Sequence, residues 1–255
     1  MSRTVLVTGA NRGIGLAFAG QLLARGDHVV ATCRHPGKAA ALNALGGEHP
    51  GRLHVLPLDV ASERSRAELV RELPLVLGED GRLDLLINNA GVLHSGERFG
   101  QLRQETLEDS LRINAIGPLL LAQALAPLLR DGNRAAGGNE DVAGTGATAA
   151  SGCPVIANLS SQLGSITGVT RFGTPSYAIS KAAQNMASAQ LAQALAARGI
   201  VVLALHPGWV QTDMGGERAP DAPVDVVAGM LRLIDAATPA QSGGFVDWRG
   251  EALPW

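Results

Sequence analysis

Short runs of valine, leucine and isoleucine alternate along the chain with longer segments whose apolar residues recur at helical spacing. Runs that are apolar throughout and only a few residues long are typical of strands buried on both faces of a parallel sheet. Seven such strands are predicted, at Thr4–Thr8, His28–Thr32, Leu53–Leu56, Leu83–Ile87, Pro154–Leu159, Ile200–His206 and Gly244–Asp247. The pattern therefore predicts one α/β domain over residues 1–255, a doubly wound parallel sheet with helices on both faces.

The segments between these strands have the apolar spacing of amphipathic or buried helices. They predict helices at Gly13–Arg25, Gly37–Leu45, Ser62–Leu73, Thr106–Asn114, Pro118–Arg130, Pro175–Arg198 and Val224–Ala236. Thr174, directly before Pro175, is the expected N-cap of the longest one.

Two segments fit neither pattern. Residues 131–152 are rich in glycine and alanine, and they predict a flexible insertion. Residues 207–223 contain three prolines and follow a strand, at the edge of the sheet where α/β proteins bind ligands. This second segment is expected to be a mobile lid over the substrate, although a plain long connection has the same composition.

Charge and composition exclude several classes of function. The chain has 21 basic and 23 acidic residues and no basic run, which argues against a nucleic-acid partner. No uninterrupted apolar stretch reaches the roughly 18–20 residues that cross a bilayer, and the N-terminus lacks a signal-peptide layout, so we expect a cytoplasmic protein without a membrane partner. Cys33 and Cys153 are too few for a disulfide framework or a zinc site, and no metal is expected.

A glycine-rich turn, TGANRGIG, joins the first predicted strand to the first predicted helix. Glycines allow a tight turn and a close approach of the backbone to a ligand. The N-terminus of the helix adds free N–H groups and a partial positive charge, which suit a pyrophosphate. The turn therefore predicts a dinucleotide site of the Rossmann type rather than a purely structural turn, with the candidate residues Gly9, Asn11, Arg12, Gly13, Ile14 and Gly15.

The end of the second strand bears on which dinucleotide binds. NAD sites usually place an aspartate or glutamate here to accept hydrogen bonds from the ribose 2′-hydroxyl. This chain has Arg34 instead, and Arg12 lies within the glycine turn. Two guanidinium groups suit a 2′-phosphate, so we expect NADP(H) rather than NAD(H) as the cofactor; the alternative is that both arginines are only solvated.

Polar and small residues also follow the third and fourth strands. Asp59 could accept a hydrogen bond from the adenine amino group while Val60 contacts the ring, although Asp59 could equally be a charge at a helix N-terminus. Asn89, Ala90 and Gly91 end the fourth strand at the ligand-binding edge, where small residues would admit a cofactor ribose.

The only tyrosine, Tyr177, and one of the two lysines, Lys181, are four residues apart in a predicted helix, so both lie on one face. A nearby ammonium group favours the phenolate, and it is expected to lower the tyrosine pKa from about 10. A tyrosine tuned in this way can give a proton to a carbonyl oxygen. The alternative is a surface pair without a catalytic role.

Two further polar residues complete the candidate site. Ser161 follows the fifth strand, as does Ser160, and a serine hydroxyl there could polarise a substrate carbonyl. Asn114 lies in a predicted helix, where asparagine is a mediocre helix former. It could hold a water molecule that relays protons to Lys181, or it could simply bend the helix.

These motifs, in this order and over nearly the whole chain, resemble the short-chain dehydrogenase/reductase family in its single-domain form. The resemblance implies a catalytic tetrad of Ser161, Tyr177, Lys181 and Asn114, with Lys181 bonding the nicotinamide ribose. The separation between Ser161 and Tyr177 is longer than is usual in the family, which leaves Ser160 and Ser165 as alternatives. The family also implies that the 207–212 stretch covers the nicotinamide, and there the candidates are Pro207, Gly208, Val210 and Thr212.

Residues 242–255 resemble the C-factor-like, or sniffer-like, carbonyl reductase branch of this family. The expected activity is therefore reversible reduction of a ketone or aldehyde, with hydride from NADPH and a proton from Tyr177. A regulatory protein that senses NADP(H) with little turnover is the main alternative, and a dehydratase or epimerase is a further one. The family usually associates through the alanine-rich helix at 182–197 and the helix before it, so a homodimer or homotetramer is expected. Side chains that could line an apolar substrate pocket are Leu163, Ile166, Val169, Phe172, Trp209 and Met214.

Overall fold

Seven parallel strands form one sheet in the order β3-β2-β1-β4-β5-β6-β7, which confirms the predicted fold class. The computed structural model describes residues 2–77, 80–132 and 152–255. The strands are β1 (Thr4–Thr8), β2 (His28–Cys33), β3 (Leu53–Pro57), β4 (Leu85–Asn88), β5 (Val155–Leu159), β6 (Val201–His206) and β7 (Phe245–Asp247). The chain runs outward from β1 to β3 and then returns to place β4 beside β1, so the direction of winding reverses between β1 and β4.

The apolar runs are continuous because both faces of the sheet are covered. Successive side chains of a strand point to opposite faces. In β1, Val5 and Val7 accordingly belong to one core, whereas Leu6 belongs to the other. All three are fully buried, so no polar alternation marks these strands.

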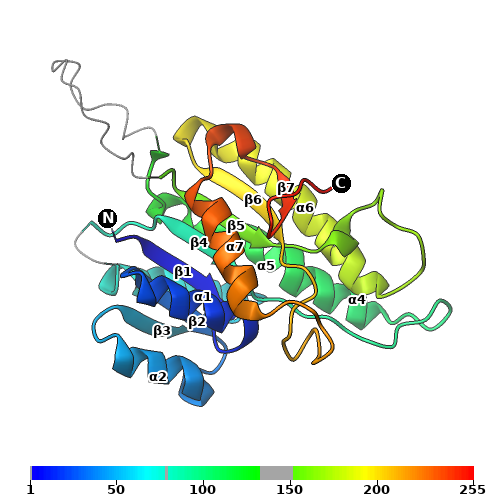
Figure 1. Ribbon diagram of the computed structural model, residues 1–255, viewed down its shortest axis with the longest axis horizontal. Helices are drawn as coiled ribbons and strands as arrows, with labels where there is room; N and C mark the ends of the chain where they lie inside the picture. Colours follow the sequence, from blue (N-terminus) through cyan, green and yellow to red (C-terminus); the bar gives the residue numbers. More distant parts are fainter. Residues whose placement is uncertain (1, 78–79, 133–151) are drawn as a thin grey trace.

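Helices on the two faces complete a three-layer arrangement. α1 (Gly13–Ala24), α2 (Ala40–Glu48) and α7 (Pro223–Asp235) contribute to the first core. Figure 1 shows α7 lying beside α1 across the strands. The second core is formed with α3 (Glu63–Glu72), α5 (Gly117–Leu125) and α6 (Pro175–Leu195), and α4 (Gln104–Leu111) packs against α6.

The two helices predicted at 106–114 and 118–130 form one continuous helix. A π-helical segment, Arg112–Ile116, joins α4 to α5 without a break. Pro118 lies at the first turn of α5, where its missing N–H leaves no gap in the hydrogen bonding because the wider π turn precedes it. The fourth strand also begins later than predicted, at Leu85, because Leu83 pairs with Leu129 in an isolated bridge.

This continuous helix, Gln104–Leu128, is long and apolar enough to cross a membrane by length and composition alone. Its mean hydropathy is high although polar residues lie within the helix. A search for uninterrupted apolar runs does not find this helix because of those polar residues. Leu121, Ala122 and Leu125 are fully buried against the sheet, and Asn114 is fully buried as well. The helix therefore packs as a core helix of this domain.

The predicted insertion at 131–152 lies, apart from its first two residues and its last, outside the described residues. The predicted lid at 207–223 is described in full. Its backbone is tied to itself, since Gln211 N donates to Asp221 O at 2.9 Å and Gly216 N donates to Thr212 O at 2.7 Å.

Candidate active site

The glycine turn links the carboxyl end of β1 to the N-terminus of α1. Gly13 begins α1 with a φ of 53°, in the left-handed region that favours glycine. A Cβ on Gly15 would collide with the carbonyl oxygen of Gly9, so only glycine allows this close packing. The N-cap residue Arg12 makes no side-chain cap bond, and the first turn of α1 has no acidic residue. The free N–H groups of this turn therefore fit an anionic group such as a pyrophosphate.

Asparagines hold this turn against the neighbouring strand. Asn89 Nδ2 donates to the carbonyl oxygens of Thr8 at 2.8 Å and Gly9 at 3.1 Å. One strand further along the sheet, Asn88 Nδ2 donates to Asn158 Oδ1 at 2.8 Å. Because both donors of its amide are occupied, Asn89 shapes the cofactor site through Gly9, while its neighbours Ala90 and Gly91 leave space beside the strand end.

The two arginines expected to recognise a 2′-phosphate differ in their surroundings. Ala10 N donates to Thr32 O at 2.9 Å, which places the glycine turn next to the end of β2, where Arg34 follows. Arg34 is exposed and makes no ion pair within the described ranges. Arg12 instead pairs with Asp213 of the 207–223 segment at 2.7 Å, in a contact where both side chains are largely exposed. No local pattern predicts this pair, because its members are 201 residues apart.

Asp59 and Val60 follow β3 at the same edge of the sheet. Asp59 is exposed, and its Oδ1 accepts a hydrogen bond from Ala61 N at 3.0 Å. Ser62, not Asp59, caps α3 by accepting from Ser65 N. Val60 is buried, and its carbonyl oxygen accepts from the Arg66 guanidinium at 2.7 Å. Asp59 therefore has acceptor capacity to spare for a ligand, whereas Val60 is anchored in the fold.

Tyr177 lies in the first turn of α6 and is buried, with its hydroxyl hydrogen-bonded to Ser161. Burial raises the pKa of Tyr177 to about 12, and the bond to Ser161 lowers it only in part. The expectation that Lys181 would lower this pKa is wrong for these residues taken alone. The physical reason is desolvation, which disfavours the phenolate more strongly than its neighbours favour it.

Lys181 lies one turn along α6 from Tyr177, with its Nζ 5.6 Å from the centre of the tyrosine ring. It is buried, and its Nζ donates to Leu159 O at 2.7 Å and to Gln184 Oε1 at 2.8 Å. Burial lowers the pKa of Lys181 to about 7, because desolvation disfavours the ammonium form. The lysine can therefore take up or release a proton near neutral pH.

The three candidate serines differ in their hydrogen-bond partners. Ser161 bonds to Tyr177, and its Oγ also accepts from Leu163 N at 3.1 Å, so it caps a short 3₁₀ turn, Gln162–Gly164. Ser160 Oγ donates to Asn185 Oδ1 at 2.5 Å in the core, and Ser165 Oγ accepts from Gly168 N at 3.1 Å. Of these three described serines, Ser161 is thus the one that is hydrogen-bonded to the phenol.

Asn114 lies within the π-helical segment and is fully buried. Its Nδ2 donates to Val92 O at 2.8 Å and to Ser180 Oγ at 2.9 Å, and its Oδ1 accepts from Val92 N at 2.8 Å. The side chain therefore ties the segment after β4 to the helix of Tyr177 and Lys181. A Cβ on Gly91 would lie 3.2 Å from Asn114 Oδ1 and 3.9 Å from Lys181 Nζ, so this glycine separates the two polar groups.

The N-terminus of α6 is capped differently from the prediction. Thr174 occupies the N-cap position, but it has a left-handed φ of 42° and makes no side-chain cap bond. Glu97, from the loop after β4, accepts from Ser176 N at 3.3 Å and from Ser176 Oγ at 2.8 Å instead. A carboxylate at this end is favourable for the helix dipole, and it fixes the turn that carries Tyr177.

The six apolar residues predicted to line a substrate pocket lie in the connection between β5 and α6 and in the segment at 207–223. All six predicted lining residues are substantially exposed, with Ile166 the most exposed at 77% and Leu163 the least at 44%. Phe172 meets Phe99 edge to face at 5.8 Å between ring centres, which joins the loop before α6 to the loop after β4. The six side chains are therefore open to solvent, and none of them is enclosed in the core.

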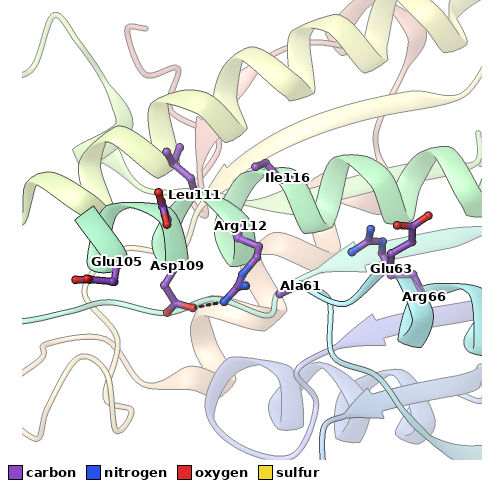
Figure 2. A pocket seen from close by; sticks show the side chains of 9 residues that line it. Ala61, Glu63, Arg66, Glu105, Asp109, Leu111, Arg112 and Ile116 are labelled. Atoms are coloured by element: carbon purple, nitrogen blue, oxygen red, sulfur yellow. Dashed lines mark hydrogen bonds and ion pairs between the residues drawn. The ribbon is translucent and has the colours of Figure 1, made fainter. Parts of the chain in front are cut away.

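Two cavities lie away from the tyrosine. One of about 570 Å³ opens between α3 and α4 and is lined by charges of both signs. Figure 2 shows its Asp109 bonded to Arg112, with Glu105 and Ile116 nearby. The other, of about 550 Å³, lies between α1, α2 and the 207–223 segment. Neither cavity includes Tyr177, so the candidate active site is defined here by its polar groups and not by a cavity.

Known proteins resemble this chain in sequence and in fold. The family model for short-chain dehydrogenases matches residues 3–139 and 148–223. C-signal of Myxococcus xanthus is 38% identical over 175 residues, which cover 69% of this chain and 94% of that protein. Among solved structures, the carbonyl reductase Sniffer of D. melanogaster aligns over 100% of both chains with a TM-score of 0.88 and 35% identity. The NADPH-bound carbonyl reductase from chicken fatty liver aligns over 100% of this chain and 99% of that one, with a TM-score of 0.86 and 35% identity.

Proposed function

The chain belongs to the short-chain dehydrogenase family, and we propose that it is an NADP(H)-dependent oxidoreductase that reduces a ketone or aldehyde to an alcohol, reversibly. The observation that carries this proposal is the convergence of Tyr177, Ser161 and Lys181 at the carboxyl ends of β4 and β5. A protein that only bound the dinucleotide would need no buried phenol and lysine in this place. The similarity to two carbonyl reductases supports the same class of substrate.

The residues present fit NADP(H). The free N–H groups at the start of α1 would hold the pyrophosphate, and Arg34 with Arg12 would hold the 2′-phosphate. Asp59 would accept from the adenine, and the space beside Ala90 and Gly91 would admit the ribose of the nicotinamide. The lid residues Pro207, Gly208, Val210 and Thr212 would cover the nicotinamide. When bound, the cofactor supplies the hydride.

The protein side of the reaction is proton transfer. Because burial holds the pKa of Tyr177 at about 12, the phenol carries its proton at neutral pH and can donate it to the carbonyl oxygen of the substrate. Ser161, bonded to the same phenol, is placed to orient that oxygen. Lys181 then supplies the replacement proton, since its pKa of about 7 allows exchange near neutral pH. We place the six exposed apolar side chains along the substrate site, where they would favour an apolar substrate.

The direct test is loss of NADPH absorbance with a panel of ketones, aldehydes and quinones. Turnover of at least one compound, dependent on Tyr177, supports the proposal. NADPH binding without turnover of any carbonyl would instead favour the sensor function.

A substitution at Gly91 tests the proton relay. The Gly91→Ala variant should fold normally, because this residue does not have a positive φ. Its new methyl group would lie 3.2 Å from Asn114 Oδ1, on the side where Lys181 Nζ lies 3.9 Å away. It would exclude a water molecule from the space between the two groups, and kcat should fall about 10-fold or more.

A matched control is Gly47→Ala in α2, at a site where a Cβ meets nothing within 4 Å and φ is not positive. This control should keep both the stability and the kcat of the wild type. Full activity of Gly91→Ala over the whole pH range would show that no relay passes this point.

We also propose a homodimer or homotetramer. Ile116 next to α5 and both Ile179 and Met186 of α6 are large apolar side chains exposed by 48%, 49% and 62%. Burial of such side chains against a second copy would remove apolar surface from water. Light scattering of the purified protein should give a mass of two or four chains, and the Met186→Glu variant should reduce it. A monomer at all concentrations would contradict this part of the proposal.

A further inference from the structure

Gln184, one turn after Lys181 on α6, is a polar residue that the sequence analysis did not single out. Its side chain is 1% exposed, and its Oε1 accepts the hydrogen bond from Lys181 Nζ at 2.8 Å. An ammonium group has three donors. Leu159 O takes the second at 2.7 Å, so one donor of Lys181 is left for the active site.

Packing alone does not explain a glutamine here. Gln184 Nε2 is buried and has no hydrogen-bond partner among the described residues. A buried donor without a partner lowers stability, whereas a leucine of similar size would fill the same space without that cost. The unpaired amide nitrogen of Gln184 therefore lowers the stability of the fold. The one hydrogen bond that its side chain makes among the described residues is the bond to Lys181.

The surroundings of Lys181 make this bond important. The helix itself presents Tyr177, whose ring centre is 5.6 Å from Nζ, and the end of β5 presents the Leu159 carbonyl group. The backbone of Gly164 packs against the backbone of Lys181, and Asn114 with Gly91 lies on the remaining side. Apart from the phenol, none of these groups is titratable. Among the described residues, the buried ammonium is thus stabilised by two neutral oxygens, Leu159 O and Gln184 Oε1.

We propose that Gln184 is a positioning residue of the reductase, which holds the Lys181 ammonium group between two carbonyl oxygens and favours its charged form. The inference rests on the proposed function in one respect only, namely that Lys181 acts in the proton relay. The bond directs the third donor of the lysine and sets the pH range in which the lysine is charged. A variant without the amide oxygen should therefore show a changed titration of Lys181. The same variant should still fold, because the amide makes no other side-chain hydrogen bond in the described part of the chain.

The test uses the full chain without cofactor, and it exploits the presence of only two lysines, Lys38 and Lys181. NMR of protein labelled with ¹³C at lysine Cε reports each side chain directly, and exposed Lys38 serves as the internal reference. The Lys181 midpoint is expected near 7 in the wild type. It should fall by at least about one pH unit in Gln184→Leu, which loses the acceptor, and rise in Gln184→Glu, which supplies a carboxylate.

Two further readouts separate positioning from structure. Above about pH 9, where the Lys181 amine is neutral in both proteins, Gln184→Leu should melt at the wild-type temperature or above it, because the unpaired Nε2 is removed. Gln184→Met serves as a second apolar variant. The pH profile of NADPH oxidation should move with the lysine midpoint in each variant. Unchanged lysine midpoints in the leucine, methionine and glutamate variants would overturn the inference. Midpoints that move in a protein without carbonyl turnover would instead overturn the proposed function and leave the role of Gln184 standing.

Discussion

Replacement of Tyr177 by phenylalanine should lower kcat by about 10²–10⁴-fold and leave the Kd for NADPH within a few-fold of the wild type. Phenylalanine keeps the buried ring but removes the hydroxyl that bonds to Ser161. The proposed acid is therefore lost, while the glycine turn and Arg34 are untouched. Initial rates of NADPH oxidation at saturating carbonyl, together with fluorescence titration of NADPH, measure the two quantities separately.

The control for this experiment is Gln190→Ala, an exposed substitution on the same helix, which should leave kcat unchanged. Turnover in the Tyr177→Phe variant at the wild-type rate would show that another group donates the proton. A protein that only senses NADP(H) would bind it equally well in both forms and show no Tyr177-dependent turnover. The pair of variants thus distinguishes the two functions.

The second large effect is expected on NADPH binding, at the proposed 2′-phosphate site beside Arg34. Arg34→Ala should weaken NADPH binding by about 10- to 100-fold, the value of a charge-assisted hydrogen bond to a phosphate. Binding of NADH should hardly change, because NADH has no 2′-phosphate. The measurement is the ratio of the two dissociation constants for each variant.

Arg232→Ala, on the exposed surface at the end of α7, is the matched control, since it removes the same charge elsewhere. Arg12→Ala should have a smaller net effect than Arg34→Ala, because Arg12 must first leave Asp213 to reach a phosphate. An equal loss of NADH and NADPH affinity in Arg34→Ala would place this arginine outside the 2′-phosphate site.

Much of the fold could be predicted because its signals are local. A strand buried on both faces needs a continuous apolar run, and β1, β5 and β6 have such runs at residues 5–7, 155–157 and 201–205. That α4 and α5 form one continuous helix could not be predicted from local signals. Asn114 and Pro118 interrupt the helical pattern, and the π-helical segment that accommodates them is held by contacts to Val92 and Ser180, which lie far away in sequence.

The candidate site shows the same division. Tyr177, Lys181 and the glycine turn are recognisable from spacing, whereas Glu97 and Gln184 have no motif and are identified only by their hydrogen bonds. The predicted direction of the Tyr177 pKa was wrong for a related reason. Spacing indicates which charge lies nearby, but the extent of burial, which dominates this pKa, depends on the whole tertiary structure.

The bond between Glu97 and Ser176 ties the loop after β4 to the first turn of α6. Phe99, two residues further along this loop, touches Phe172 of the loop before α6. The loop after β4 therefore holds the start of α6 at two points, one polar and one aromatic. A ligand that displaced this loop would also displace the turn that carries Tyr177, so binding on one segment would be felt on the other.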